Sequence, residues 1–362
     1  MARQRQTGDG PPGVDEIRTA AYEAGWEPAE TDLATAPPEE QALHLGLTVT
    51  DEELRAGERM ISAADEAVAA IRQLFAAPPA VDWRNNGGNF VTSVKNQASC
   101  GSCVSFATLA TIESRANIVC RTPGQQRDYS EAYLFYCGCG NCCGTGWNFA
   151  PALEFCKNTG VAAEAKFPYT PGNQPCRPGV TPDFKITGYT VLPSQAERRA
   201  AIADGGPVVA GMAVYQDFYA YKSGIYKHVS GGLVGYHAIS VVGYDDTQQC
   251  WICKNSWGTG WGDSGFFRIA YGQCGIDTQF PFYAPQVPCP TPPCTQYVTH
   301  LRRVIVAARA NPSLRRCLLY YICGRGRRPI CPASHARVVQ LVRRILATCP
   351  QYRRAFCSAI MS

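Results

Sequence analysis

The sequence predicts an α+β protein that carries an N-terminal arm and a helical, disulfide-rich C-terminal extension. Small and apolar residues recur at helical spacing between about residues 103 and 156, and runs of strand-forming residues follow from 184 to 270. Charge and cysteine content change sharply on either side of this central stretch. We therefore expect three parts: an acidic arm at 1–77, a central domain at 78–285, and a Pro-rich linker with a basic extension at 286–362.

Charge is strongly segregated along the chain. The net charge of +5 comprises −9 for residues 1–76, +1 for residues 77–288 and +13 for residues 289–362, where thirteen arginines stand with no acidic residue. Such a basic segment is expected to face something anionic: a membrane surface, nucleic acid, a polyanionic glycan or the chain's own acidic arm. Nucleic acid is the least favoured, because the segment lacks aromatic interleaving and a known binding motif.

All 19 cysteines lie beyond residue 99, twelve of them before residue 289 and seven from there on. So many cysteines favour disulfides over a metal site, and we expect a secreted or lysosome-like, oxidising location. The first residues nevertheless show no apolar signal segment, and no stretch is long and apolar enough to span a membrane. We expect a monomer without cofactor or metal.

The arm begins with Gly-, Pro- and acid-rich sequence to about residue 47, which predicts an extended or partly disordered segment. Thr50, followed three residues later by Glu53, is a capping box for a helix that runs to about Phe75. Apolar residues form a stripe along this helix, so one of its faces is expected to be buried.

The central domain divides into a helical half and a strand-rich half. Helices are expected from Cys103 and again between Ser130 and Cys156. The second half is rich in β-branched and aromatic residues, which favour strands. The expected strands cover 184–192, 208–214, 237–244, 251–254 and 265–270.

The stretch NQASCGSCVSF, from 96 to 106, places Cys103 at the expected start of a buried helix. There the positive end of the helix dipole lowers the pKa of a thiol and favours the thiolate. Two later motifs add to it: YHA around His237 before an apolar run, and KNSWGTGWG, which contains Asn255. Cys103, His237 and Asn255 would supply a nucleophile, a base and a residue that orients the base.

Together these motifs resemble those of the papain family of cysteine proteases. The resemblance implies a two-lobed fold, with Cys103 on a mostly helical lobe and with His237 and Asn255 on a β-barrel-like lobe across a cleft. It also implies hydrolysis of peptide bonds through a thioester: the Cys103 thiolate attacks the carbonyl, and the His237 imidazolium protonates the leaving amine. No insertion that would close the cleft is evident, so an endopeptidase acting on proteins or peptides is expected.

The resemblance extends to two residues beside this set. Gln97 would form the oxyanion hole together with the backbone N–H of Cys103, and Trp257 would shield the bond between orienter and base from water. Two positions depart from the family pattern: Val104 replaces a Trp, and Thr145 replaces a Gly. These departures leave open a weakly active homologue that serves as a binding module, and the same residues would also suit a peptide ligase.

Family members usually carry an inhibitory prosegment where this chain has its arm. The helical signature of that prosegment is absent from residues 1–77. The arm therefore either inhibits the enzyme by lying over the cleft, or is a plain structural cover.

The stretch CGCGNCCGTGW, from 137 to 147, resembles the family's substrate-binding loop. In that alignment Thr145 and Gly146 fall where two glycines let the substrate backbone hydrogen-bond in extended form. The cysteine spacing would also suit a metal cluster, but a disulfide among Cys139, Cys142 and Cys156 is favoured. The partners of Cys120, Cys250, Cys253, Cys274 and the cysteines of the extension stay open. The resemblance implies the pairs Cys100–Cys143 and Cys137–Cys176.

Substrate preference is expected to depend on the S2 pocket, which holds the second residue on the acyl side of the cut. Matching segments put Trp147, Gly211, Ala238 and Gln279 on its walls and floor. Small residues leave room, so we expect a bulky apolar side chain there, with some tolerance of polar ones. The strand that contains Gly211 would otherwise be simply core.

The extension follows the Pro-rich linker PQVPCPTPPC, which is expected to be stiff. Its small size and seven cysteines predict that disulfides staple its helices together. Helical runs are expected at 298–310, 314–323, 336–347 and 352–360.

Overall fold

The computed structural model describes residues 12–69, 77–289, 295–349 and 352–361. The chain forms two compact units, Met1–Pro288 and Cys289–Ser362, and each unit has an apolar core of its own. Among the described helices, none is both long and apolar enough to cross a bilayer.

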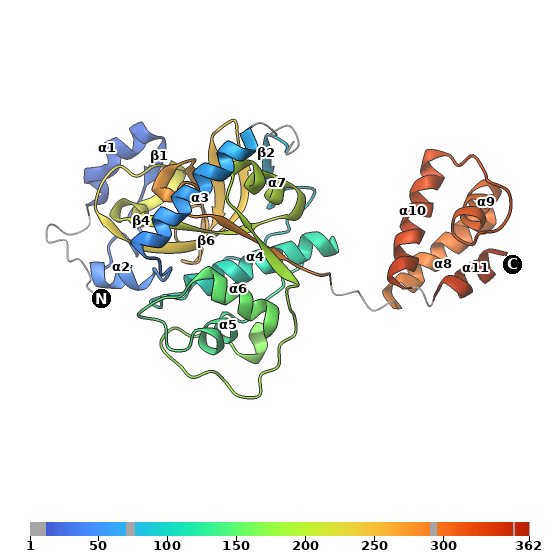
Figure 1. Cartoon of the computed structure of the whole chain (residues 1–362), viewed down its shortest axis with the longest axis horizontal. Coiled ribbons are helices and arrows are strands. Elements are labelled where there is room, and N and C mark those ends of the chain that lie inside the picture. Colours follow the sequence, from blue (N-terminus) through green and yellow to red (C-terminus); the bar gives the residue numbers. More distant parts are fainter. Residues whose placement is uncertain (1–11, 70–76, 290–294, 350–351, 362) are drawn as a thin grey trace. The chain divides into compact units, whose positions relative to one another are not determined.

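A helical lobe occupies one side of the larger unit (Figure 1). Its central helix α4 (Cys103–Cys120) is buried over most of its length, because small and apolar residues occupy nearly all of its faces. Helices α5 (Glu131–Gly138) and α6 (Phe149–Asn158) pack beside it, and each begins at a side-chain cap, Ser130 and Asn148 respectively.

The other lobe is built on a sheet whose strand order is β1-β5-β8-β7-β6-β4-β9-β3, with β2 paired to β6. The long strand β6 lies between β4 and β7. Helix α4 packs on β6, and a hydrogen bond of 2.8 Å joins Thr111 of α4 to Ser240 of β6. Helix α7 (Gln195–Gly205) packs on this lobe. The strands are β1 (Trp26–Pro28), β2 (Ala80–Asp82), β3 (Gly188–Leu192), β4 (Val208–Tyr215), β5 (Tyr221–Tyr226), β6 (Leu233–Asp245), β7 (Cys250–Lys254), β8 (Phe266–Ala270) and β9 (Phe282–Gln286).

The expectation of an extended or disordered arm up to residue 47 is wrong for the residues that the structure describes. The arm forms α1 (Val14–Ala24), strand β1 and α2 (Pro38–Leu43) before it reaches α3 (Asp51–Ala69). Ile17 and Ala21 are buried in the core of the sheet lobe, and β1 pairs with the distant strand β5. Tertiary contacts thus stabilise helices that the local composition disfavours.

The start of the long arm helix is confirmed. Glu53 accepts hydrogen bonds from the backbone N–H and the hydroxyl of Thr50, and the Glu53 N–H donates to that hydroxyl at 3.2 Å. The expected end near Phe75 lies outside the described residues. In Figure 1 helix α3 crosses in front of the sheet lobe.

The smaller unit is helical, as expected. It contains α8 (Thr295–Ala310), α9 (Pro312–Tyr321), α10 (Ala333–Thr348) and α11 (Arg353–Met361). Its core includes Leu318, Val342 and Ile360, which are fully buried. Disulfides Cys317–Cys331 and Cys323–Cys357 staple the helices, and Cys289 and Cys349 are also disulfide-bonded.

Candidate active site

Cys103 is the first residue of α4 and its thiol is fully buried. The backbones of Ala238 on β6 and of Gly46 in the arm lie within hydrogen-bonding range of this thiol. The expectation of a lowered thiol pKa is wrong in this structure, which we call the closed form because the arm covers Cys103. Burial outweighs the helix dipole and the neighbouring backbone N–H groups, and it raises the pKa of Cys103 to about 12.

His237 and Asn255 meet across two neighbouring strands. His237 lies on β6, Asn255 directly follows β7, and Nε2 of the imidazole is 2.8 Å from Oδ1 of the amide. Asn255 Oδ1 also accepts a hydrogen bond from the backbone N–H of Ser256 at 2.8 Å, so the amide oxygen is held in place. Since Oδ1 can only accept, Nε2 carries the proton and Nδ1 is left as a proton acceptor.

A covering aromatic ring and burial keep the His237 imidazole neutral in the closed form. The ring of Trp257 lies 4.9 Å from the His237 ring, centroid to centroid, and covers it. Burial lowers the pKa of His237 to about 4, His44 of the arm adds to the lowering, and the hydrogen bond to Asn255 opposes it. Within the described residues, Nδ1 of His237 has no hydrogen-bond partner.

Gln97 is fixed by bonds at both ends of its side-chain amide. Its Nε2 donates to the carbonyl oxygens of Cys100 at 2.9 Å and of His44 at 3.1 Å. Its Oε1 accepts from the hydroxyl of Ser256 at 2.6 Å. Sequence reasoning missed Ser256, although it directly follows Asn255 in the same motif.

The arm segment from His44 to Thr48 passes through this site. The His44 carbonyl accepts from both Gln97 and the indole N–H of Trp257, the latter at 3.3 Å. Two residues later Gly46 lies over Cys103, and its carbonyl accepts from the backbone N–H of Trp147 at 2.7 Å. The arm therefore contacts Gln97, Trp257, Cys103 and Trp147, four of the residues that the sequence predicts for the site.

The loop before α6 holds this arm segment mainly through the backbone of Trp147, with a further hydrogen bond to Thr145. Leu47 pairs with Trp147 as a parallel bridge, in which Thr48 donates from its backbone N–H to the Trp147 carbonyl at 2.8 Å. Thr145 accepts only from the Thr48 hydroxyl, at 3.1 Å. Gly146 has a φ of +77° and packs directly against Gly46, so a side chain there would collide with the arm.

Leu47 fills the pocket that the sequence assigned to Gly211, Ala238 and Trp147. It is buried in one apolar cluster with Trp147 and Ala238, and a Cβ added at Gly211 would lie 2.6 Å from its Cδ2. Phe280 closes the same pocket, and nothing in the sequence around it indicated this. Gln279 instead contacts the arm helix, where its Nε2 donates to Glu58 at 2.7 Å.

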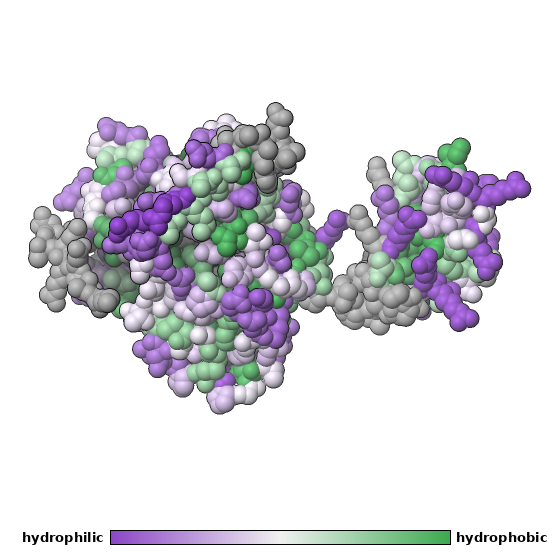
Figure 2. All heavy atoms as spheres, in the orientation of Figure 1, coloured by the Kyte–Doolittle hydropathy of each residue, from purple (hydrophilic) through white to green (hydrophobic). Residues whose placement is uncertain are grey.

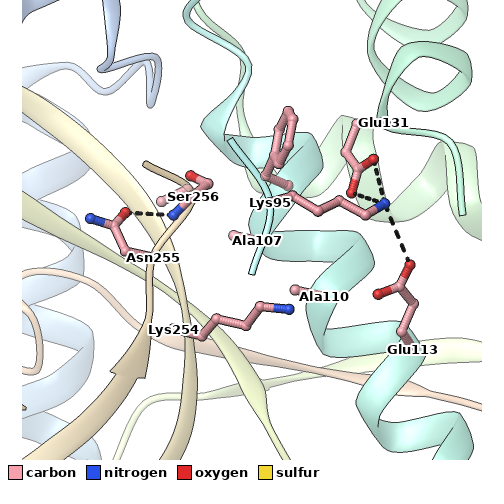
Figure 3. Close-up of a pocket in the computed structure, with 10 residues that line it drawn as sticks. Lys95, Ala107, Ala110, Glu113, Glu131, Lys254, Asn255 and Ser256 are labelled. Atoms are coloured by element: carbon pink, nitrogen blue, oxygen red, sulfur yellow. Dashed lines mark hydrogen bonds and ion pairs between the residues drawn. The ribbon is translucent and has the colours of Figure 1, made fainter. Parts of the chain in front are cut away.

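A buried ion network lies behind the site, between the two lobes (Figure 3). Lys95 donates to both carboxylate oxygens of Glu131 at 2.9 and 2.8 Å and forms ion pairs with Asp128 and Glu113. Although burial opposes it, these carboxylates raise the pKa of Lys95. Lys254, next to Asn255, is buried nearby, and burial lowers its pKa to about 8.

Disulfides hold the loop that binds the arm. They join Cys100 to Cys143 and Cys137 to Cys176, the two pairs that the resemblance implies. A third bond joins Cys139 to Cys142, and Cys156 is a free, buried thiol. Among the described residues, no group of three or more potential metal ligands is present.

The remaining central cysteines differ in state. Cys120 is disulfide-bonded, whereas Cys250, Cys253 and Cys274 are free and buried.

Comparison with known proteins points to the same region. Residues 77–284 match the papain family of cysteine proteases. Cysteine proteinase 2 of Entamoeba histolytica is 37% identical over 223 residues, which cover 57% of this chain and 68% of that protein. Ananain of Ananas comosus is 35% identical over 214 residues, which cover 56% of this chain and 60% of ananain.

Solved structures share the fold. Digestive procathepsin L 3 of Tenebrio molitor larval midgut matches with a TM-score of 0.58 and 26% identity, over 75% of this chain and 86% of its own. Bromelain of Ananas comosus in complex with the inhibitor E64 matches with a TM-score of 0.50 and 34% identity, over 58% and 100%. Procathepsin B of Trypanosoma congolense, at 23% identity and a TM-score of 0.61, covers 76% and 97%. The expected two-lobed α+β fold is confirmed.

Proposed function

Since the chain belongs to the papain family of cysteine proteases and is a cysteine peptidase, we propose that it is an endopeptidase whose reaction is carried out by Cys103, His237, Asn255 and Gln97. The observation that carries this proposal is the 2.8 Å bond between His237 and Asn255, with the Cys103 thiol beside the backbone of the residue that follows His237. We assign the arm to 1–77, catalysis to 78–285 and the linker with the extension to 286–362.

The mechanism uses Nδ1 of His237 as the proton acceptor, because Asn255 bonds to the other ring nitrogen. With Nε2 bonded to Asn255, Nδ1 of His237 takes the proton of the Cys103 thiol, and the thiolate attacks the substrate carbonyl. The Gln97 amide and the Cys103 backbone N–H donate to the oxyanion as it forms. The imidazolium then gives its proton to the leaving amine, and water hydrolyses the thioester.

In the proposal the arm inhibits this enzyme, and its direction through the site is the reverse of a substrate's, which protects it from cleavage. Along the arm, the residue over Cys103 (Gly46) precedes the residue in the S2 pocket (Leu47), whereas in a substrate the S2 residue comes first. Proform relatives support an inhibitory role. Bromelain in complex with E64 covers 58% of this chain, whereas procathepsin L 3 covers 75%. The proform thus matches a larger part of this chain than bromelain does.

Substrates are proteins or peptides that present a bulky apolar residue to S2. Leu47 serves as a stand-in for that residue, surrounded by Trp147, Ala238 and Phe280. Gly211 supplies the space, because any side chain there would collide with the occupant. The disulfides fit an oxidising compartment, so we assign the enzyme to a secreted or lysosome-like location.

Labelling with an epoxide thiol inhibitor tests both parts of the proposal. We expect mass mapping to find the label on Cys103 in a chain that begins at residue 78, and little label on the full chain. Equal labelling of both chains would contradict inhibition by the arm but not the catalytic role. Absence of labelling in both would favour an inactive homologue, and accumulation of transpeptidation product with an added amine would favour a ligase.

A further inference from the structure

The smaller unit carries a surface charge that the catalytic proposal does not use. Residues 289–362 contain thirteen arginines and no acidic residue. Of the eleven arginine side chains that the structure describes, ten are exposed and Arg315 is half-buried. Figure 2 shows hydrophilic side chains projecting from several parts of this unit. A surface of one sign, in a segment that contains no acidic residue, attracts an anionic partner.

Five of these arginines lie around the C-terminal end of α9, three in the loop that follows it and two, Arg343 and Arg353, that bond to residues at this end. The loop from 324 to 330, with the sequence GRGRRPI, leaves this end and exposes Arg325, Arg327 and Arg328. Ile330 at its close is 98% exposed, more than any other large apolar residue that the structure describes. Disulfides Cys323–Cys357 and Cys317–Cys331 anchor the loop on both sides, so it is presented from a fixed base.

A hollow of about 240 Å³ lies at the same end of α9. Arg343 donates to the carbonyl of Tyr321 at 3.3 and 3.2 Å, and its guanidinium lies 5.6 Å from the centre of the Tyr321 ring. Arg353 donates to the Ile322 carbonyl at 2.9 Å. Each guanidinium has five N–H donors, so both arginines can also bind a phosphate in this hollow. Arg328 lies within hydrogen-bonding range of the Tyr321 side chain.

We propose that this end of the unit, which we call the loop end (the loop 324–330 with Arg343 and Arg353), docks on an anionic phospholipid surface. The arginines bind lipid phosphates, and Ile330 inserts among the acyl chains. Because Ile330 is exposed, a lipid surface is favoured over nucleic acid or a glycan as the anionic partner. An apolar side chain gains free energy by leaving water for hydrocarbon, whereas nucleic acid and glycan backbones offer it no comparable surface. A basic patch and an inserted apolar side chain both strengthen binding to an anionic bilayer, since the binding scales with buried apolar area and with electrostatic attraction.

Sedimentation of the full chain with vesicles tests the proposal. We expect the protein to sediment with vesicles of phosphatidylcholine that contain phosphatidylserine, and not with pure phosphatidylcholine. Added salt should weaken the binding, because it screens the arginine–phosphate attraction. Binding to both kinds of vesicle alike, or to neither, would overturn the proposal.

Matched variants locate the docking surface. Ile330→Ser should weaken partitioning about tenfold, since it removes the apolar anchor. Val306→Ser removes an apolar residue that is 66% exposed on α8, towards the end of the unit where α8 meets α9, and should leave partitioning unchanged. Arg327→Gln should weaken partitioning roughly fivefold. Arg316→Gln removes the same charge from an exposed site one turn into α9 and should have a smaller effect.

Two results would overturn the assignment of the loop end to a lipid surface. If Arg327→Gln and Arg316→Gln weakened vesicle binding equally and Ile330→Ser had no effect, the attraction would be a diffuse one and the loop end would not be the docking surface. If heparin or duplex DNA displaced the protein from vesicles while Ile330→Ser left all three affinities unchanged, a polyanion would be the better partner.

Discussion

The side-chain amide of Gln97 donates a hydrogen bond of 3.1 Å to the backbone carbonyl of His44, which belongs to the arm. The same carbonyl accepts from the indole of Trp257. The donor that the mechanism assigns to the oxyanion is thus already engaged in the closed form. The arm must therefore withdraw His44 before a substrate carbonyl can use this donor.

Removal of that donor should reduce turnover without removing the nucleophile. We expect Gln97→Ala, in a chain that begins at residue 78, to lower kcat about a hundred- to a thousandfold, because one oxyanion-hole donor is lost. Ser256→Ala should cost about tenfold, since Ser256 only holds the Gln97 amide through its 2.6 Å bond. Peptide hydrolysis measures kcat, and iodoacetamide labelling of Cys103 serves as the control. Loss of labelling in Gln97→Ala would show structural damage instead.

Leu47 should decide how tightly the arm is held. It is 6% exposed in its pocket, so Leu47→Ala should weaken the closed state by about 2–5 kcal/mol. We expect the full chain carrying this change to react with the epoxide at least about tenfold faster than the unchanged chain. Leu43→Ala, at a position that is 39% exposed, is the matched control. Equal acceleration by both changes would contradict the assignment of Leu47.

Acid should favour release of the arm through His44. Burial lowers the pKa of this imidazole, and its bond to the Glu40 carbonyl only partly opposes the shift. Below the ordinary histidine pKa, the released arm takes up a proton more readily than the closed arm, so the closed state loses stability as pH falls below about 6.5. The Cys103–His237 pair contributes little to this slope, since opening moves a proton from thiol to imidazole without uptake from solvent.

The rate of epoxide labelling of the full chain, followed between neutral and acidic pH, measures this effect. We expect His44→Gln to flatten the pH dependence, with the chain that begins at residue 78 as the reference for the intrinsic reactivity of Cys103. Other groups that act on or face His44 are the Glu40 carboxylate, whose charge raises the pKa of His44, the Trp257 ring and His237. An unchanged slope in His44→Gln would assign the dependence to another group.

The residues that we propose for catalysis could be picked out from sequence because each stands in a short linear motif. The chemistry of Cys103, His237 and Asn255 depends on residue type and spacing, and both can be read directly from the sequence. The state of the thiol could not be predicted, because it depends on a cover some 57 residues away in sequence, at Gly46. The helix dipole was visible in the sequence, but the burial that outweighs it was not.

The arm was the least predictable part of the fold. Helix α1 carries Val14, Ile17 and Ala21 at helical spacing, but nearby glycines, prolines and acids hid this pattern. Strand β1 exists only because it pairs with β5, almost 200 residues away. By contrast, α7 has a full capping box, Ser194 with Glu197, and this signal was present in the sequence and missed.

The buried ion network gives a last prediction, on stability. Lys95→Met removes the cation that pairs with Glu131, Asp128 and Glu113, two of which are almost fully buried, so carboxylates are left without compensation. We expect a loss of about 3–5 kcal/mol in the free energy of unfolding, because breaking a buried ion pair leaves an unpaired charge in a poorly solvated site. Lys157→Met breaks a pair with Glu154 in which both side chains are about 40% exposed, and should cost less than about 1 kcal/mol. Denaturant unfolding of both variants measures the difference. Similar losses in the two would mean that water reaches Lys95 and that the network is not a buried link between the lobes.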